Sequence, residues 1–273
     1  MHIPDGFLDG EALAIGAVAA AVGIGVCLRQ ARGDQRERDL PVAGLCAAFF
    51  LVGDAPMFPI TVGTEGHLLG GTLAVALLGP WLGALTIAVV CAIQALVLGD
   101  GGVASMGLNI VNLALIPAFV GYPLILGLRR LLPTTDNGLS IACALAAGVS
   151  VILASCLYVS EFALGAAVDI NLRTLAYSTI GAYCVIAVIE GTITALIVRA
   201  LLQVRPDLVR VAEPLRRARE QAAVAALRQQ SESAAAATLT RDGKIPAAEP
   251  GGAAAGAPAA PSVSRPRGAE AGA

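Results

Sequence analysis

Long apolar stretches separated by short polar loops recur along the first two thirds of this chain, and they constrain its fold more than any other feature. Apolar residues make up 56% of the sequence and charged residues 14%, and the mean hydropathy is +0.76. These values are typical of a membrane protein with several spans and exclude an ordinary soluble domain. A bilayer core of about 30 Å is crossed by about 20 helical residues. The stretches predict seven spans, near residues 11–28, 40–54, 68–79, 81–98, 106–128, 139–163 and 174–202.

The third and fourth stretches adjoin, and a proline decides whether they form one helix or two. Pro80 follows Gly79, and a proline inside a helix removes an amide donor and clashes with the preceding turn. A single helix over residues 68–98 would also be too long for one span. We therefore expect two helices here, the first of them short.

Arginines are distributed unevenly among the expected loops, and this predicts the orientation. They gather between spans one and two, between spans five and six, and at and after span seven, whereas only Arg173 lies in a loop of the opposite side. With seven spans the three clusters share one side, which the positive-inside rule assigns to the cytoplasm. The N-terminus and residues 55–67 then face outward, and the C-terminal tail is cytoplasmic. The clustered arginines are Arg29, Arg32, Arg36, Arg38, Arg129, Arg130, Arg199, Arg205, Arg210, Arg216, Arg217 and Arg219.

The two histidines of the chain, His2 and His67, both fall on this outer face. The Met1 amine, the His2 amide nitrogen and Nδ1 of the His2 ring can close a five-membered and a six-membered ring around one cation. That chelate leaves one corner open, which the imidazole of His67 can fill. Four nitrogens in a plane suit Ni(II), Cu(II) or low-spin Co(II) rather than Zn(II), Mg(II) or Ca(II). Because the segment before the first span is acidic and has no basic n-region, we expect no signal peptide and an intact Met1.

Three sequence blocks carry a family resemblance. They are MHIPDGFL at residues 1–8, GTEGHLLGG at residues 63–71, and Gly101-Gly102 followed by GLNIVN at residues 107–112. In this order, over roughly residues 1–203, they resemble the CbiM/NikM family, the substrate-binding membrane component of cobalt and nickel energy-coupling factor transporters. The resemblance implies an all-α, seven-helix bundle whose N-terminal loop, residues 1–10, folds into the centre from outside. Met1, His2 and His67 would there hold Ni(II) or Co(II) as the transported ion, and the choice between the two metals stays open.

Residues beside this site have more than one interpretation. The carboxylate of Glu65 attracts cations, bonds a ring N–H of a ligand histidine, or points to water. Asn109 and Asn112 lie on one face of span five, where they either bond the N-terminal loop or a ligand ring, or join neighbouring helices. Glu190, an acid near the middle of span seven, is interpreted as a hydrogen-bonded packing residue in preference to a proton carrier.

The sequence contains no ATP-binding motif of the form GxxxxGK[ST], so uptake against a gradient requires partners. The resemblance implies two ATPase subunits, a transmembrane coupling subunit and, as an optional further partner, a small accessory membrane subunit, all at the bacterial inner membrane. Ala43 and Ala47 on span two have the spacing of small residues that permits close helix contact, and we interpret them as a docking surface for the coupling subunit. No platform of aromatic residues for nucleic acid is present.

Composition divides the chain into three parts. Residues 1–204 form the seven-span metal-binding domain. Residues 205–230 are rich in arginine among alanine, leucine and acids, which predicts a basic amphipathic helix on the cytoplasmic surface. Residues 231–273 are dominated by Ala, Pro and Gly and are expected to be disordered.

The sequence thus favours the specificity component of an ATP-driven uptake system, and two alternatives remain. A metal exporter or a metal sensor would use the same site. An intramembrane metal-dependent hydrolase, with Glu65 or Glu190 as its base, is disfavoured because a catalytic metal keeps an open position, whereas protein nitrogens fill all four corners here.

Overall fold

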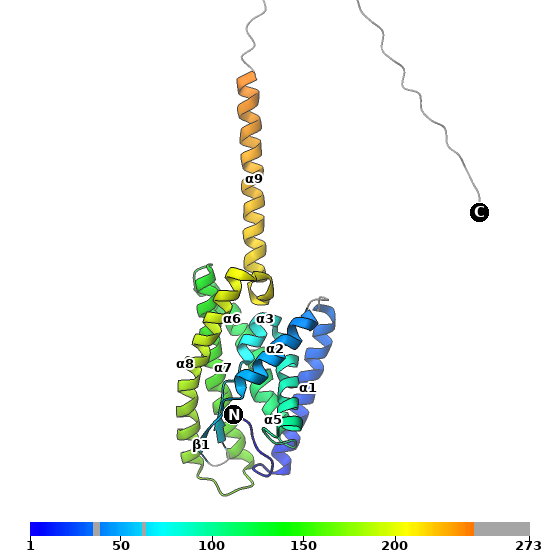
Figure 1. Ribbon diagram of the computed structural model, residues 1–273, viewed down its shortest axis with the longest axis vertical. Coiled ribbons are helices and arrows are strands. Elements are labelled where there is room, and N and C mark those ends of the chain that lie inside the picture. Colours follow the sequence, from blue (N-terminus) through cyan, green and yellow to red (C-terminus); the bar gives the residue numbers. More distant parts are fainter. Residues whose placement is uncertain (35–38, 62–63, 243–273) are drawn as a thin grey trace, which may run out of the picture. The chain divides into compact units, whose positions relative to one another are not determined.

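The computed structural model describes residues 1–34, 39–61 and 64–242 (Figure 1). Most of the described chain is helical, and its only strands form one short hairpin, which confirms the all-α class. Some residues used above lie outside the described part. These are Arg36 and Arg38 of the first arginine cluster, Gly63 of the histidine loop, and residues 243–273 of the tail.

Among the residues that the structure describes, five helical stretches are long and apolar enough to cross a membrane, which makes the chain a multi-pass membrane protein. They are Gly10–Gly33 within α1 (Gly10–Asp34), Pro80–Leu98, Met106–Leu131, α7 (Asp136–Gly165) and α8 (Leu172–Val204). The second consists of α4 (Pro80–Ile93) and the π-helical turn Gln94–Leu98, and the third of α5 (Met106–Ile110), the π-helical turns Val111–Leu115 and Pro117–Gly121, and α6 (Tyr122–Leu131).

The two remaining expected spans correspond to shorter helices. α2 (Asp39–Asp54) has 16 residues and α3 (Gly71–Leu78) has 8, or about 24 Å and 12 Å at 1.5 Å per residue, against a hydrocarbon core of about 30 Å. The seven-span count therefore stays a prediction. The expected break between the third and fourth stretches is confirmed, since α3 ends at Leu78 and α4 begins at Pro80, with Gly79 between them at a φ of 83°.

One end of the bundle gathers the N-terminal segment, the hairpin and the loop between α7 and α8 (Figure 1). The strands β1 (Phe58–Thr61) and β2 (Thr64–Gly66) pair antiparallel within the expected outer loop. Backbone hydrogen bonds join the N-terminal segment to the α7–α8 loop, from Asp9 N to Gly165 O at 2.8 Å and from Ala167 N to Phe7 O at 2.9 Å. The chain's first residues thus enter the bundle from this end.

The arginine clusters meet at the opposite end. Nη1 of Arg129 donates to the carbonyl of Val211 at 2.9 Å, and Nη1 of Arg210 lies 3.0 Å from a carboxylate oxygen of Asp39. These contacts join the segment after α8, with its short 3-10 turns Pro206–Leu208 and Arg210–Ala212, to the ends of α2 and α6. Arg129 of the second cluster and Arg210 of the third therefore lie at the same end of the bundle, together with the start of α2. The orientation in the membrane stays a prediction.

The chain divides into two compact units, residues 1–221 and 222–273. The first holds the bundle and the beginning of α9 (Glu213–Asp242). In the second, the helix continues to Asp242, past residue 231 where composition predicts disorder to begin. The four alanines at 234–237 favour a helix, and the first proline of the tail is Pro246.

Candidate functional site

The N-terminal segment is buried inside the bundle, which is unusual for a chain end that carries an amine. Met1 and Ile3 have no exposed surface and His2 is 5% exposed. Asn109 of α5 holds both polar backbone atoms of Ile3: its Oδ1 accepts from Ile3 N at 2.8 Å, and its Nδ2 donates to Ile3 O at 3.4 Å. The hydroxyl of Ser105 also donates to Ile3 O. The N-terminal segment is therefore fixed in place against the start of α5.

A glycine loop before α5 permits this close approach. The amide of Gly102 donates to Ile3 O at 2.8 Å, and a Cβ added at Gly102 would collide with Asp5. Gly101 has a φ of 80°, and a Cβ there would lie 3.0 Å from Cβ of His2. The carboxylate of Asp5 accepts from the backbone amides of Val103 and Ala104, at 3.1 and 2.9 Å. The glycines quoted in the third sequence block thus have a packing reason: a side chain would displace His2 if placed at Gly101 and Asp5 if placed at Gly102.

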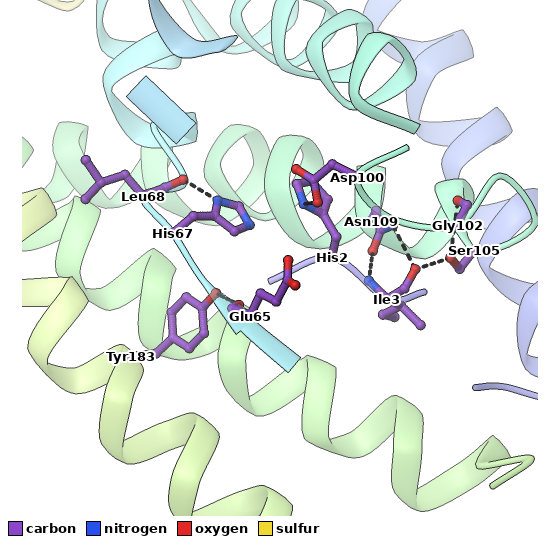
Figure 2. Close-up of polar contacts among 10 residues, drawn as sticks. All are labelled: His2, Ile3, Glu65, His67, Leu68, Asp100, Gly102, Ser105, Asn109 and Tyr183. Carbon is purple, nitrogen blue, oxygen red and sulfur yellow. Dashed lines mark hydrogen bonds and ion pairs between the residues drawn. The ribbon is translucent and has the colours of Figure 1, made fainter. Parts of the chain in front are cut away.

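The rings of His2 and His67 lie against each other. Their centroids are 4.6 Å apart and their planes differ by 10°. His67 is 2% exposed and directly follows β2, whereas His2 lies in the N-terminal segment. The two rings therefore come from separate segments of the chain (Figure 2). The structure therefore brings together the three residues predicted to hold the metal.

Hydrogen bonding leaves ring nitrogens with free lone pairs at this place. Nδ1 of His67 lies 2.6 Å from the carbonyl oxygen of Leu68, and since a carbonyl only accepts, Nδ1 carries the proton and Nε2 carries the lone pair. Nε2 of His67 is buried and has no hydrogen-bond partner among the described residues. Both ring nitrogens of His2 are also buried without one: Nδ1 lies 3.0 Å from a carboxylate oxygen of Asp100, but outside hydrogen-bond geometry.

Burial keeps the nitrogen donors neutral. It lowers the pKa of the Met1 amine from its ordinary 8.0 to about 5, with the nearby carboxylate of Asp100 opposing the change. Burial also lowers the pKa of His2, and burial together with the charge of the amine lowers the pKa of His67 well below its usual value. For Asp100, burial alone would raise the pKa, but contact with His2 outweighs it, and the pKa falls. At neutral pH the site thus consists of uncharged nitrogen groups beside a carboxylate.

Side chains alone do not form a metal cage here. Within the described part of the chain, no group of three or more His, Cys, Asp and Glu side chains is placed to hold an ion. A metal bound between the two rings would need main-chain nitrogens, which Met1 and His2 supply. An open pocket of about 780 Å³ leads to His2 and is lined by Glu65 and Asp100 among others. The exposed side chain of Glu65 therefore borders the way in, while its carbonyl accepts from the Tyr183 hydroxyl at 3.0 Å (Figure 2).

The remaining predicted residues separate into different roles. Asn112 does not reach the N-terminal segment: its Nδ2 donates to Glu161 of α7 at 2.9 Å, so it joins two helices. Ala43 is buried against Leu78 and Leu82, within this chain's own core. Ala47 is partly buried against the main core. Both alanines are thus used in internal packing, and docking of a coupling subunit on α2 stays a prediction.

Two contacts around the two histidines cannot be predicted from the sequence. The first is that of Asp100, whose carboxylate lies beside the His2 ring and which no motif marks in the sequence. Glu190 of α8 was recognised as a buried acid, but its partners were not: its carboxylate oxygens accept from the amides of Leu69 at 2.8 Å and Gly70 at 3.1 Å. The interpretation as a hydrogen-bonded packing residue agrees with these bonds.

Comparison with known proteins identifies the family. A family model described as the cobalt uptake substrate-specific transmembrane region, CbiM, matches residues 2–208. The chain belongs to this family. The resemblance that the three sequence blocks indicate is thereby confirmed, and the match ends shortly after α8.

Relatives and solved structures agree with the CbiM assignment. The chain is 34% identical over 209 residues to a putative metal transport protein of Haloquadratum walsbyi, which covers 77% of this chain and 93% of that protein. It is 32% identical over 209 residues to a putative fused nickel transport protein, NikMN, of Archaeoglobus fulgidus, covering 77% and 68%. Its fold is similar to the crystal structure of a transition metal transporter, with a TM-score of 0.70, 27% identity, and coverage of 79% and 100%.

CbiM membership and the five apolar helices together place the protein in the bacterial inner membrane as a multi-pass protein. They support a role in the uptake of a metal, with cobalt and nickel as the substrates of the family.

Proposed function

We propose that this protein is the substrate-specificity component of an ATP-driven uptake system and that it captures Ni(II) or Co(II) from outside the cell. The observation that carries the proposal is the buried set of unprotonated nitrogens around His2 and His67. Buried polar atoms normally have hydrogen-bond partners, and three ring nitrogens here have none among the described residues. Each neutral ring carries one lone pair, so the two rings together offer two lone pairs that a metal ion would satisfy.

The proposed ligands are the Met1 amine, the amide nitrogen and Nδ1 of His2, and Nε2 of His67. The first three form a chelate of fused five- and six-membered rings, and the fourth comes from a separate loop. The bond between Nδ1 of His67 and the Leu68 carbonyl supports this assignment, because it fixes the tautomer that leaves Nε2 free to bind. When the ion binds Nδ1 of His2, it takes over the place beside that nitrogen now held by the carboxylate of Asp100.

The route of the ion follows from the pocket that leads to His2. Under the positive-inside rule, the end of the bundle opposite the arginine clusters faces outward. The pocket lining includes Pro59 of β1 and Glu65 of β2, whose hairpin lies at this end. The negative charges of Glu65 and Asp100 at its lining attract cations. In this proposal α2 and α3 complete a seven-helix bundle, with the C-terminal part in the cytoplasm, where residues 205–230 form a basic surface segment.

Energy for uptake comes from partners in this proposal. Two ATPase subunits and a transmembrane coupling subunit, with or without a small accessory membrane subunit, would move the bundle between outward and inward states. Release of the ion follows when His67 separates from the N-terminal chelate, since three nitrogens bind less tightly than four.

Metal analysis of purified protein tests the ligand assignment. Protein with Met1 as its first residue is loaded with Ni(II) or Co(II), freed of excess ion, and analysed by mass spectrometry. We expect about one ion per chain in the wild type, and loss of the ion in His2→Ala and in His67→Ala. Undiminished metal in the double variant would overturn the assignment. Asn171→Ala, which removes the N-cap of α8, serves as a control remote from the site.

Transport direction separates uptake from export and sensing. Cells that express the protein with its coupling and ATPase subunits should accumulate radiolabelled nickel or cobalt, and cells that lack those subunits should not. Net loss of preloaded metal would indicate an exporter, and an unchanged metal content would favour a sensor. A hydrolase would turn over a substrate without any ATPase partner.

A further inference from the structure

Helix α8 holds the histidine loop at two points. The hydroxyl of Tyr183 donates to the carbonyl of Glu65 at 3.0 Å. The carboxylate of Glu190 accepts from the amides of Leu69 at 2.8 Å and Gly70 at 3.1 Å. The first contact therefore lies just before His67 in the sequence and the others lie just after it.

The spacing of the two side chains on α8 matches the length of the loop. Tyr183 and Glu190 are two helical turns apart, which places them on one face of the helix. Both are buried, with exposed fractions of 0% and 3%. One rigid helix face therefore sets the distance between the two ends of the segment that carries His67.

The loop has little other means of holding its shape. Between β2 and α3 it makes no regular structure, and it passes through Gly70, which has a φ of 66°. The amides of Leu69 and Gly70 precede the first turn of α3, where helical geometry offers no acceptor. The two carboxyl oxygens of Glu190 accept from these two amides, so that its side chain supplies the acceptors that the helix cannot. Without Glu190, both amides lose their acceptor inside the protein, and the loop loses the contacts that fix its position after His67.

We infer that Tyr183 and Glu190 are positioning residues for His67, so that α8 sets whether the fourth nitrogen can reach the ion. This inference rests on the proposed function, since it assumes that His67 is a ligand. Neither residue touches the ion, and each acts through the backbone of the loop. If α8 moves relative to the N-terminal segment, His67 therefore moves away from the chelate, while Met1 and His2 remain in place.

Cu(II) spectroscopy distinguishes positioning from general stabilisation. Cu(II) favours the same planar nitrogen geometry as Ni(II) and binds more tightly, so that weakened variants still load fully. The number of nitrogens around Cu(II) is read from its paramagnetic resonance spectrum and from the energy of its visible absorption band. His67→Ala provides the reference spectrum for a site with three protein nitrogens.

The variants remove the two contacts separately. Glu190→Gln keeps the volume of the side chain but only one acceptor oxygen, and Glu190→Ala keeps none. Tyr183→Phe removes only the hydroxyl. Thr194→Val is the matched control, because Thr194 lies one turn from Glu190 on α8 and its buried hydroxyl has no hydrogen-bond partner within the described residues.

We expect the spectra of Glu190→Ala and of the combined Glu190→Gln and Tyr183→Phe variant to shift toward that of His67→Ala. Nickel affinity should fall about 10–100-fold, as for other hydrogen-bond partners of metal ligands. Thr194→Val should keep the wild-type spectrum. Folding is checked by size-exclusion chromatography in detergent, and the Gln and Phe variants, which keep side-chain volume, provide the result if Glu190→Ala does not fold.

Wild-type spectra and affinities in all the Glu190 and Tyr183 variants would overturn the inference while leaving the ligand assignment intact. If the wild-type spectrum itself matches that of His67→Ala, His67 is not a ligand, and the proposed site fails together with the inference. Failure of the positioning inference is thus detected in the α8 variants, and failure of the ligand assignment is detected in the wild-type protein.

Discussion

His2 and His67 come from distant parts of the sequence, yet their imidazole rings stack with centroids 4.6 Å apart. Neither ring is held there by a hydrogen bond to the other. His2 belongs to the N-terminal segment, which is hydrogen-bonded to α5. His67 belongs to a loop that is hydrogen-bonded to α8. The proposed metal site therefore lies where two separately supported segments meet, and each support can be tested by itself.

Extension of the N-terminus should abolish metal capture. A single glycine before Met1 converts the amine into an amide and also places an added residue where Met1 is fully buried. The affinity for Ni(II) should fall by more than the about 10–100-fold that the loss of a ligand's hydrogen-bond partner costs. Isothermal titration of purified protein measures the affinity. The same glycine added after Ala273 is the control, and equal affinities of the two proteins would exclude the amine as a ligand.

The affinity for Ni(II) should rise with pH, but less steeply than that of a free peptide with the same first residues. Binding displaces the proton of the His2 amide, so affinity gains about tenfold per pH unit for that proton. In the protein, the Met1 amine has a pKa of about 5 instead of 8.0 and is already neutral between pH 6 and 7.5. In the peptide the amine must lose its proton as well.

Titrations at several pH values compare the two slopes over this range. The protein should release about one proton per ion. The peptide should release between about two and about three, because its free imidazole, with a pKa of about 6.5, is partly protonated over this range. Below pH 5 the protein slope should steepen as the amine becomes protonated. Equal slopes for protein and peptide at neutral pH would show that the amine is not buried in the folded protein.

Asn109 and Asn112 should differ in their effect on metal binding although they lie side by side on one span. Asn109→Ala removes the side-chain amide that bonds both the N–H and the carbonyl of Ile3. The N-terminal segment that contains His2 is then held less firmly. We expect a loss of about 10–100-fold in Ni(II) affinity. Asn112→Ala breaks a bond to Glu161 of α7, and it should lower the thermal midpoint while leaving the affinity of the folded protein unchanged. Similar affinities for the two variants would contradict the assignment of Asn109.

Two glycine substitutions should change stability in opposite directions. A Cβ at Gly71, the first residue of α3, would collide with the carbonyl oxygen of Leu113 and the ring of Pro117. Gly71→Ala should therefore destabilise the protein by about 1–3 kcal/mol. Gly25 of α1 has open space around it, and Gly25→Ala should stabilise by up to about 1 kcal/mol because alanine favours the helix. Thermal unfolding in detergent measures both, and a lower midpoint for Gly25→Ala would contradict the open space beside that residue.

The linear pattern of the chain was sufficient for features that depend on neighbouring residues. Apolar runs indicated the helical membrane protein, because every span must satisfy its own backbone in lipid. Pro80 indicated the break after α3, because proline cannot donate to the preceding turn. The arginines indicated which loops share a side, and chelate geometry indicated Met1, His2 and His67. None of these inferences needs knowledge of which helices touch.

The tertiary structure decided everything that depends on partners distant in sequence. Asn109 and Asn112 have the same side chain. Their partners differ because the N-terminal segment passes beside Asn109, which bonds Ile3, whereas Asn112 faces α7 and bonds Glu161. The sequence indicates only that Glu190 is a buried acid. The structure adds that its carboxyl oxygens accept from two backbone amides in the loop of His67. Composition also cannot show where α2 and α3 end, because packing and the hairpin set their length. The amino-acid sequence thus indicated the membrane protein and the proposed ligands, and the long-range hydrogen bonds determined how the segments that carry those residues are held.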